Sequence, residues 1–259
     1  MRQLLPEAID DVDPVAAYAA DARPAPHGRP WVLVNMISSV DGATAVEGVS
    51  GPLGGPADKA VFGAIRGVAD AIVVGAGTVR AEGYGRPRRH GDRPPPRLAV
   101  VTASADLDPG LRLFAPADDA GDGERPIVLT TASAPPVRTE ALAEVAEVVV
   151  AGDDRVDLAL ALAELAGRGV EVALAEGGPS LNGQLVAAGL VDEWCVTWSP
   201  SLVSGSSSRA AHGPAHPDGL QRMRLDRLLV EDDLCFARYV RLDSSVISAA
   251  KSDRSSNPL

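Results

Sequence analysis

Short apolar runs alternate with amphipathic stretches along most of the chain. β-branched or apolar runs predict strands at 31–37, 71–75, 98–102, 127–130, 147–150 and 172–175. Between these runs, apolar residues recur every three to four positions, which predicts helices after Pro56 and near 139–145 and 157–166. Repeated strand–helix units of this kind are typical of a layered α/β fold with parallel strands.

The helix after Pro56 has a predicted core-facing stripe formed by Val61, Phe62, Ile65 and Val68. It leads into the run at 71–75, where consecutive positions are apolar, as in a strand covered on both faces. We therefore expect that strand in the middle of the sheet.

The pattern changes in the last third of the chain. Residues 194–198 are strand-like, a loop rich in Gly, Ser, His and Pro follows at 203–219, and 225–240 alternates around an acidic turn. This predicts a closing antiparallel hairpin. We expect a folded domain at 31–243, preceded by a flexible extension at 1–30 with a short helix, and followed by a disordered Ser-rich tail at 244–259.

Composition and charge exclude several classes of function. Twenty-four Lys and Arg against 35 Asp and Glu give a net charge of −11, which repels a phosphate backbone, and aromatic residues make up 3% of the chain. No nucleic-acid partner is expected. Cys195 and Cys235 are interpreted as reduced core thiols, and His212 and His216 lie in a loop without a third ligand, so no metal site is predicted. No apolar stretch has the length of a signal or a membrane span, which favours a cytoplasmic protein.

A glycine-bearing loop follows the central predicted strand. The chain reads Gly75-Ala76-Gly77-Thr78 at the carboxyl end of that strand. Glycines there let the backbone approach a ligand, and Thr78 is placed to cap the next turn. The third glycine of the dinucleotide fingerprint is absent, so this loop by itself fits either a nucleotide site or a structural turn.

A second such loop follows the predicted strand at 172–175. It reads Glu176-Gly177-Gly178-Pro179, and the proline is placed at the start of a helix whose first backbone amides are free. Such a helix start suits a diphosphate. Glu176 would repel a phosphate, so it faces either a substrate or, as its charge alone favours, the solvent.

The third loop, Ser39-Val40-Asp41-Gly42, comes directly after the first predicted strand. An Asp before a Gly most often accepts hydrogen bonds from nearby amides in a turn. The residues alone leave Asp41 open to a structural or a catalytic interpretation.

In this order and spacing, the three loops resemble the reductase domain of bacterial riboflavin biosynthesis, which has the dihydrofolate reductase-like fold. The resemblance covers about residues 31–242 and includes Arg66, Asp70 and the segment 190–193. It implies a three-layer α/β/α domain with a mixed, mainly parallel central sheet and a C-terminal antiparallel hairpin. It also implies an NADPH-dependent enzyme similar to 5-amino-6-(5-phosphoribosylamino)uracil reductase, in which hydride transfer opens the ribose of an aminopyrimidine to a ribityl chain.

The resemblance also implies roles for the loop residues. Asp41 and Glu176 match carboxylates near the substrate and are the candidate catalytic residues. The candidate cofactor-binding residues are Gly75, Gly77, Thr78, Thr102, Gly177, Gly178, Pro179 and Ser180. No Arg or Lys stands beside Thr102, where related folds hold the adenosine 2′-phosphate, so NADPH is expected from the resemblance alone.

The chain departs from the family near the expected substrate. Ala43 stands where the family usually has Lys, 53–55 lack a hydroxyl, and 81–85 replace an Asp-Asp-Pro stretch. The arginines within 86–89 form either replacement phosphate contacts or a solvated basic loop. Tyr84, on the same loop, is left outside the catalytic set.

These departures leave three functions open. The first is the pyrimidine reductase, the second a dihydrofolate or pterin reductase on the same fold, and the third an NADPH-binding protein without chemistry. No deaminase motif occurs, so a stand-alone reductase module is expected. Trp194 and Trp198 have same-face spacing on one strand, in a region through which the family commonly dimerises, so the resemblance implies a homodimer.

Overall fold

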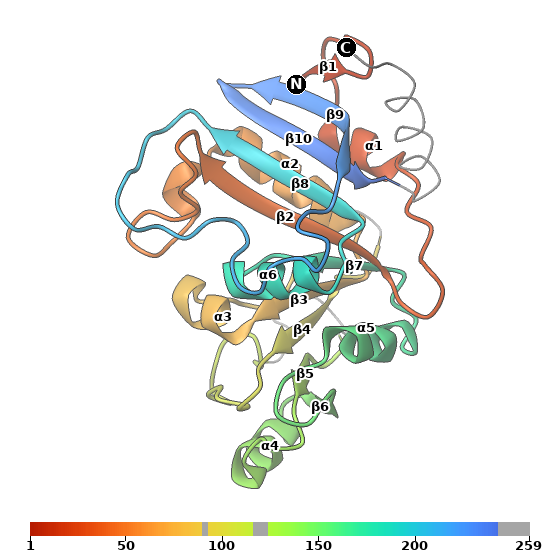
Figure 1. Cartoon of the computed structure of the whole chain (residues 1–259), viewed down its shortest axis with the longest axis vertical. Helices are drawn as coiled ribbons and strands as arrows, with labels where there is room; N and C mark the ends of the chain where they lie inside the picture. The colour runs from red at the N-terminus through yellow and green to blue at the C-terminus, as the bar shows by residue number, and fades with distance from the viewer. Residues whose placement is uncertain (90–92, 116–123, 243–259) are drawn as a thin grey trace.

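The computed structural model describes residues 1–89, 93–115 and 124–242, and the predicted tail at 244–259 lies outside these ranges. The strands in the described ranges are Arg2–Leu5 (β1), Trp31–Ser39 (β2), Ala71–Gly75 (β3), Arg97–Val101 (β4), Ile127–Thr130 (β5), Glu147–Val150 (β6), Val172–Ala175 (β7), Glu193–Ser199 (β8), Met223–Glu231 (β9) and Leu234–Arg241 (β10). They form one sheet in the order β1-β9-β10-β8-β2-β7-β3-β4-β5-β6 (Figure 1).

The sheet is parallel from β8 to β6 and antiparallel at its other end. β2 pairs in parallel with both β7 and β8, β3 lies between β7 and β4, and β10 and β9 form an antiparallel hairpin beside β8. The acidic turn of this hairpin contains Asp232 and Asp233 with positive φ angles, which Asp tolerates better than most residues. The expected mixed, mainly parallel sheet with a C-terminal hairpin is confirmed.

Helices cover both faces of the sheet. They are Pro14–Ala19 (α1), Pro56–Gly67 (α2), Ala76–Glu82 (α3), Pro136–Ala143 (α4), Leu158–Ala166 (α5) and Pro179–Ala187 (α6), with a short 3₁₀ turn at Gly51–Leu53 (η1). One core cluster packs α1, α2, α3 and α4 against one face of the sheet. A second cluster packs α5 and α6 against the other face (Figure 1). These are the three predicted layers. No helix within the described ranges combines the length and the hydropathy needed to cross a membrane.

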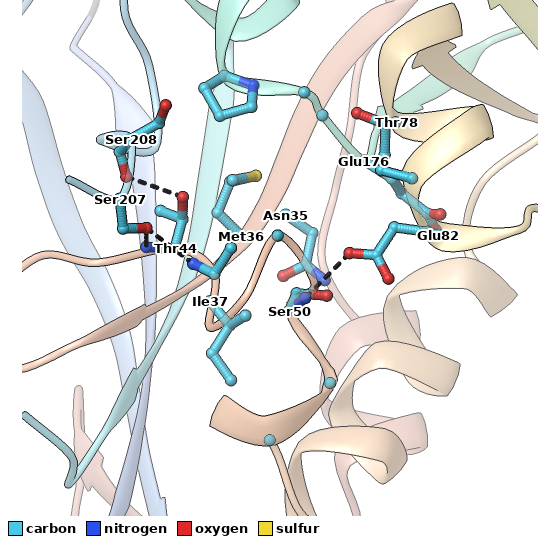
Figure 2. Close-up of a pocket in the computed structure, with 18 of the residues that line it drawn as sticks. Asn35, Met36, Ile37, Thr44, Ser50, Thr78, Glu82, Glu176, Ser207 and Ser208 are labelled. Atoms are coloured by element: carbon cyan, nitrogen blue, oxygen red, sulfur yellow. Dashed lines mark hydrogen bonds between the residues drawn. The ribbon is translucent and has the colours of Figure 1, made fainter. Parts of the chain in front are cut away.

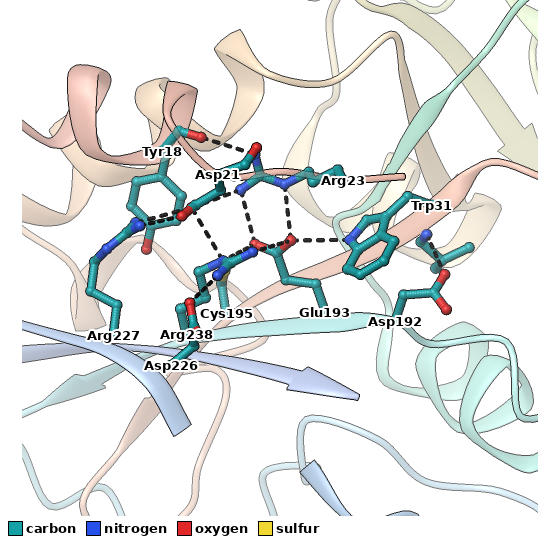
Figure 3. Close-up of polar contacts among 11 residues, drawn as sticks. Tyr18, Asp21, Arg23, Trp31, Asp192, Glu193, Cys195, Asp226, Arg227 and Arg238 are labelled. Atoms are coloured by element: carbon teal, nitrogen blue, oxygen red, sulfur yellow. Dashed lines mark hydrogen bonds and ion pairs between the residues drawn. The ribbon is translucent and has the colours of Figure 1, made fainter. Parts of the chain in front are cut away.

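The first 30 residues correct one expectation, because they belong to the folded domain. β1 pairs antiparallel with β9, and the Tyr18 side chain is buried in the core. Arg23 donates two hydrogen bonds to Glu193, whose carboxylate also accepts from Trp31 and Arg238 (Figure 3). Buried charges are stable only when paired, so these contacts fasten the N-terminal segment to β8 and β10. The prediction of a flexible segment failed because the partners of its charged residues lie about 170 residues away in the sequence, where a local pattern does not reveal them.

Candidate active site

A cavity of about 840 Å³ opens at the carboxyl ends of the parallel strands. Its floor is formed by Asn35, Met36 and Ile37 of β2, and in Figure 2 these side chains lie between two groups of polar residues from different loops. Parallel strands place the loops that follow them at one edge, which is where α/β proteins bind ligands. The cavity therefore gathers segments from positions 35 to 208.

The glycine-bearing loops form one wall of the cavity. Gly77 and Thr78 come from the start of α3, and 177–179 come from the loop before α6. The two loops meet because β3 and β7 are neighbours, and the Gly75 amide donates to the Gly177 carbonyl at 2.9 Å. A Cβ at position 178 would lie 2.7 Å from Thr78 Oγ1, so this contact requires glycine. Pro179 starts α6 and leaves the first amides of that helix free to meet an anion.

A second wall is formed by one face of α2. Asp58, Phe62 and Arg66 are four residues apart, so they share this face, and Lys59 lines the cavity beside Asp58. Burial raises the pKa of the Asp58 carboxyl, although the Thr197 side chain and Lys59 act in the opposite direction. Phe62 was predicted in the core stripe, but it is half-exposed and lines the cavity, whereas Val61 and Ile65 are buried.

Glu176 joins the two walls through a buried ion pair. Its carboxylate accepts hydrogen bonds from Arg66 Nε and Nη2, both at 2.6 Å, and from the Tyr84 hydroxyl. The side chains of Glu176 and Arg66 are 3% and 19% exposed, and the Arg66 guanidinium lies 4.3 Å from the centre of the Phe62 ring. Burial and the charge of Glu176 raise the pKa of Tyr84 well above its ordinary value, which keeps the hydroxyl protonated. Glu176 is therefore not the surface carboxylate that its charge alone suggested.

A serine-rich loop covers the cavity from the remaining side. Ser207 Oγ accepts hydrogen bonds from the amides of Thr44 and Ala45, each at 3.1 Å, and the Thr44 hydroxyl donates to the Ser208 carbonyl (Figure 2). These bonds hold the loop at 203–208 against the loop that follows β2. The covering loop and its partner are thus fixed to one another.

Asp41 lies beside this covering loop and is not among the described residues that line the cavity. Its carboxylate accepts hydrogen bonds from the Ser39 hydroxyl and from the backbone amides of Val203 and Ser204. These hydrogen bonds lower the pKa of Asp41 to about 2. The geometry supports the turn-forming interpretation of Asp41, with partners that are distant in sequence.

We expect Asp41→Asn to raise KM severalfold and to change kcat little, because the start of the loop at 203–208 loses the charged acceptor of its Val203 and Ser204 amides while the cavity lining is retained. The folded pKa is lower than the usual 3.8, so the anchoring is complete above pH 3.8 and is lost as the pH falls toward 2. NMR shifts of the Val203 and Ser204 amides in the native protein report this titration. A collapse of kcat with KM unchanged would instead assign Asp41 a catalytic role.

The structure brings together six of the ten predicted site residues in the cavity lining: Glu176, Gly77, Thr78, Gly177, Gly178 and Pro179. The other four lie outside the described lining. Gly75 shapes the loop junction, Ser180 is exposed on the first turn of α6, and Thr102 is buried after β4. The arginines at 86, 88 and 89 also lie outside the described lining.

Sequence reasoning missed most of the polar residues opposite the glycines. Asp58, Lys59 and Arg66 supply charge to the cavity, and Ser207 with Ser208 supply its cover. The spacing of four between residues 58, 62 and 66 was a usable signal for a ligand-facing stripe. The serines carried no such signal, because a loop of small polar residues resembles any solvated loop.

The chain matches the RibD C-terminal domain over residues 30–231 of its 259 residues. It belongs to this family. A 2,5-diamino-6-ribosylamino-4(3H)-pyrimidinone 5′-phosphate reductase of Methanothermobacter thermautotrophicus is 37% identical over 185 residues, which are 70% of this chain and 82% of that protein. The enzyme of the same name from Archaeoglobus fulgidus is 30% identical over 214 residues, covering 77% and 93%.

A crystal structure of a pyrimidine reductase-like protein from Corynebacterium diphtheriae superposes on this RibD-type domain with a TM-score of 0.74. The sequences are 30% identical, and the match covers 83% of this chain and 93% of that one. The expected family, its fold and its class of oxidoreductase are confirmed.

Proposed function

We propose that this RibD-type domain is an NADPH-dependent reductase of an aminopyrimidine ribosyl phosphate. The observation that carries the proposal is one cavity with two complementary walls. Glycine loops and a helix start suit a diphosphate on one wall, and Lys59 and Arg66 bring positive charge to the other. Lys59 offers a contact for the substrate phosphate, although Ala43 stands where the family usually has Lys.

The residues present fit a dinucleotide. Gly178 lets its loop approach Thr78 closely, because a Cβ there would collide with Thr78 Oγ1, and the backbone at Gly77 faces open space, since no heavy atom lies within 4 Å of a Cβ placed there. We assign Gly77, Thr78, Gly177, Gly178 and Pro179 to the cofactor diphosphate. Gly75 and Ser180 shape the two loops, and Thr102 lies on the side assigned to the adenosine. When bound, NADPH supplies the hydride.

The protein's task is then to hold the open ribosyl group against the cofactor. Asn35, Met36 and Ile37 form the floor of the cavity under the reacting atoms and help to exclude water from them. Glu176 fixes Arg66 and Tyr84 so that their N–H and O–H groups keep one geometry beside the substrate. Reduction adds hydride to C1′ of the open imine and a proton to its nitrogen, and the Tyr84 hydroxyl is the neutral protonated group beside Glu176 and Arg66.

We test the proposal with the purified chain and NADPH, following NADPH oxidation with two kinds of substrate in parallel. The expected result is rapid turnover of the aminopyrimidine ribosyl phosphate, slow turnover of dihydrofolate and weaker binding of NADH than of NADPH. Faster turnover of dihydrofolate would support the pterin reductase. NADPH binding without turnover of either would support a non-catalytic protein.

A homodimer remains a prediction. Trp194 packs against the second core cluster, whereas Trp198 is 39% exposed and makes an edge contact with Tyr239. The surface that carries Trp198 is the expected contact between subunits. Sedimentation of the wild type and of Trp198→Ala measures whether the protein forms a dimer and whether this surface is its contact.

A further inference from the structure

The covering loop continues into a segment at 209–212 that lies against α6, the helix whose start is assigned to the cofactor diphosphate. The Ser208 carbonyl accepts a hydrogen bond from the Thr44 hydroxyl at 2.9 Å, on the substrate side of the cavity (Figure 2). The Ala210 carbonyl accepts one from Asn182 Nδ2 of α6, also at 2.9 Å. One residue separates these two carbonyls, and a span of two Cα steps of about 3.8 Å leaves little slack between the contacts. A shift at one contact therefore reaches the other.

Backbone contacts hold the same segment on α6. The His212 amide donates to the carbonyl of Pro179, the first residue of the helix, at 3.0 Å. A Cβ at Gly183 would lie 2.0 Å from the His212 carbonyl oxygen, so the segment packs on a position that requires glycine. Inside a helix, alanine is the better helix former. The close backbone contact accounts for the glycine at this position.

Asn182 has the features of a positioning residue. Its side chain is fully buried and lies outside the described lining of the cavity, so it contacts neither of the proposed ligands. Among the described residues, the Ala210 carbonyl is the one hydrogen-bond partner of that side chain, and Asn182 Oδ1 is buried without a partner. A buried amide oxygen without a partner costs stability. A leucine would fill the same space without that cost, so stability alone does not account for the asparagine.

We propose that Asn182 is a positioning residue that couples the two ligands, so that a bound cofactor diphosphate tightens the binding of the substrate. This inference rests on the proposed function, and it adds the route by which one wall of the cavity affects the other. A diphosphate at the start of α6 fixes the helix and, through Asn182 and the segment at 209–212, the covering loop. The substrate then meets a loop that is already ordered, and less conformational entropy is lost when it binds. By linkage, the substrate tightens cofactor binding by the same factor.

The main test measures this factor with two ligands that do not react with one another. 2′-Phospho-ADP-ribose is the part of NADP⁺ that keeps the diphosphate and lacks the nicotinamide. Its dissociation constant is measured by calorimetry with and without a saturating concentration of the aminopyrimidine ribosyl phosphate. In the wild type we expect the ribosyl phosphate to tighten its binding about 5- to 20-fold. Both ligands are anionic, so their direct electrostatic interaction would have the opposite sign.

Asn182→Leu should reduce this factor to less than about 2, while the affinity for 2′-phospho-ADP-ribose alone stays within about twofold of the wild type. The matched control is Gln184→Leu, the same kind of change on the same helix. Gln184 is exposed, and its side-chain amide donates to the Ser180 carbonyl of α6 at 3.2 Å, so this contact does not reach the covering loop. We expect the control to keep the wild-type factor.

A second variant keeps the inference testable if Asn182→Leu does not fold. Gly183→Ala retains Asn182 but places a Cβ against the His212 carbonyl, so the segment at 209–212 must move off α6. The helix itself is retained, because alanine favours a helix more than glycine does. Gly183→Ala should therefore reduce the factor as Asn182→Leu does.

The outcomes separate this inference from the proposed function. A factor of one in the wild type, or the wild-type factor in the folded Asn182→Leu or Gly183→Ala variant, would overturn the coupling and leave the reductase intact. Weaker binding of 2′-phospho-ADP-ribose alone by Asn182→Leu, with the factor unchanged, would limit Asn182 to the structure of α6 and would also overturn the coupling. If the wild type failed to bind 2′-phospho-ADP-ribose or the ribosyl phosphate, the proposed function would be overturned, and this inference with it.

Discussion

Gly178→Ala is expected to weaken NADPH binding roughly 10- to 100-fold. The added Cβ would lie 2.7 Å from Thr78 Oγ1, where no real Cβ is found, so one of the two loops must move. The φ of −78° at Gly178 is one that alanine adopts readily. Calorimetric titration of NADPH into the folded variant measures the effect.

Two comparisons show whether the collision is responsible. Gly167→Ala is the control, because its Cβ would make ordinary contacts at 3.6 Å and the residue lies at the end of α5, outside the described lining. If Thr78 is the obstacle, adding Gly178→Ala to Thr78→Ala should cost little further affinity. Wild-type affinity in Gly178→Ala would contradict the assignment of this loop to the cofactor.

The strands that the sequence predicted best are short continuous apolar runs in the parallel part of the sheet. The predicted bounds of β3, β5, β6 and β7 coincide with the observed ones, because a continuous apolar run has few other places in a small domain. α4 begins at Pro136, about one turn earlier than its apolar pattern, since proline suits a first helical turn whatever its hydropathy. Both results follow from local chemistry.

Charged contacts between distant segments could not be predicted in this way. Asp21 and Arg23 read as solvated positions in a polar extension, yet their side chains are 9% and 4% exposed and pair with Arg227 and Glu193 (Figure 3). Nothing in the spacing of these residues states which partner will neutralise them. Such pairing depends on the assembled sheet, and the same is true of the loop at 203–208.

In the candidate site, too, features set by local sequence were predicted and those set by long-range contacts were not. The glycine loops were found because tight turns after strands require particular residues, whereas Asp41 could be interpreted from the sequence in two ways. Its observed partners, the amides of Val203 and Ser204, are more than 160 residues away. Asp58 was missed because a single carboxylate on a helix is usually solvated, and only the cavity distinguishes it.

Glu176→Gln is expected to lower the free energy of unfolding by about 3 kcal/mol, because it leaves the charge of Arg66 without its buried partner. In the native protein, burial opposes the charge of Arg66 and Glu176 offsets that cost, raising the pKa of the guanidinium. In the variant the guanidinium stays charged, because its ordinary pKa lies far above neutral, and the cost of burying it is no longer offset. The same change frees Tyr84 from its acceptor. We expect kcat/KM to fall roughly 100-fold, since a small displacement of positioning groups has effects of that size.

Denaturant unfolding and steady-state kinetics are measured together, with Glu164→Gln as the matched control. Glu164 pairs with Arg168 at 2.8 Å on the surface, where the side chains are 40% and 26% exposed, so its substitution should cost less than about 1 kcal/mol and leave turnover unchanged. Loss of turnover without loss of stability would mean that Glu176 contacts the substrate itself. Loss of stability with normal turnover would limit the pair with Arg66 to holding α2 against the loop before α6.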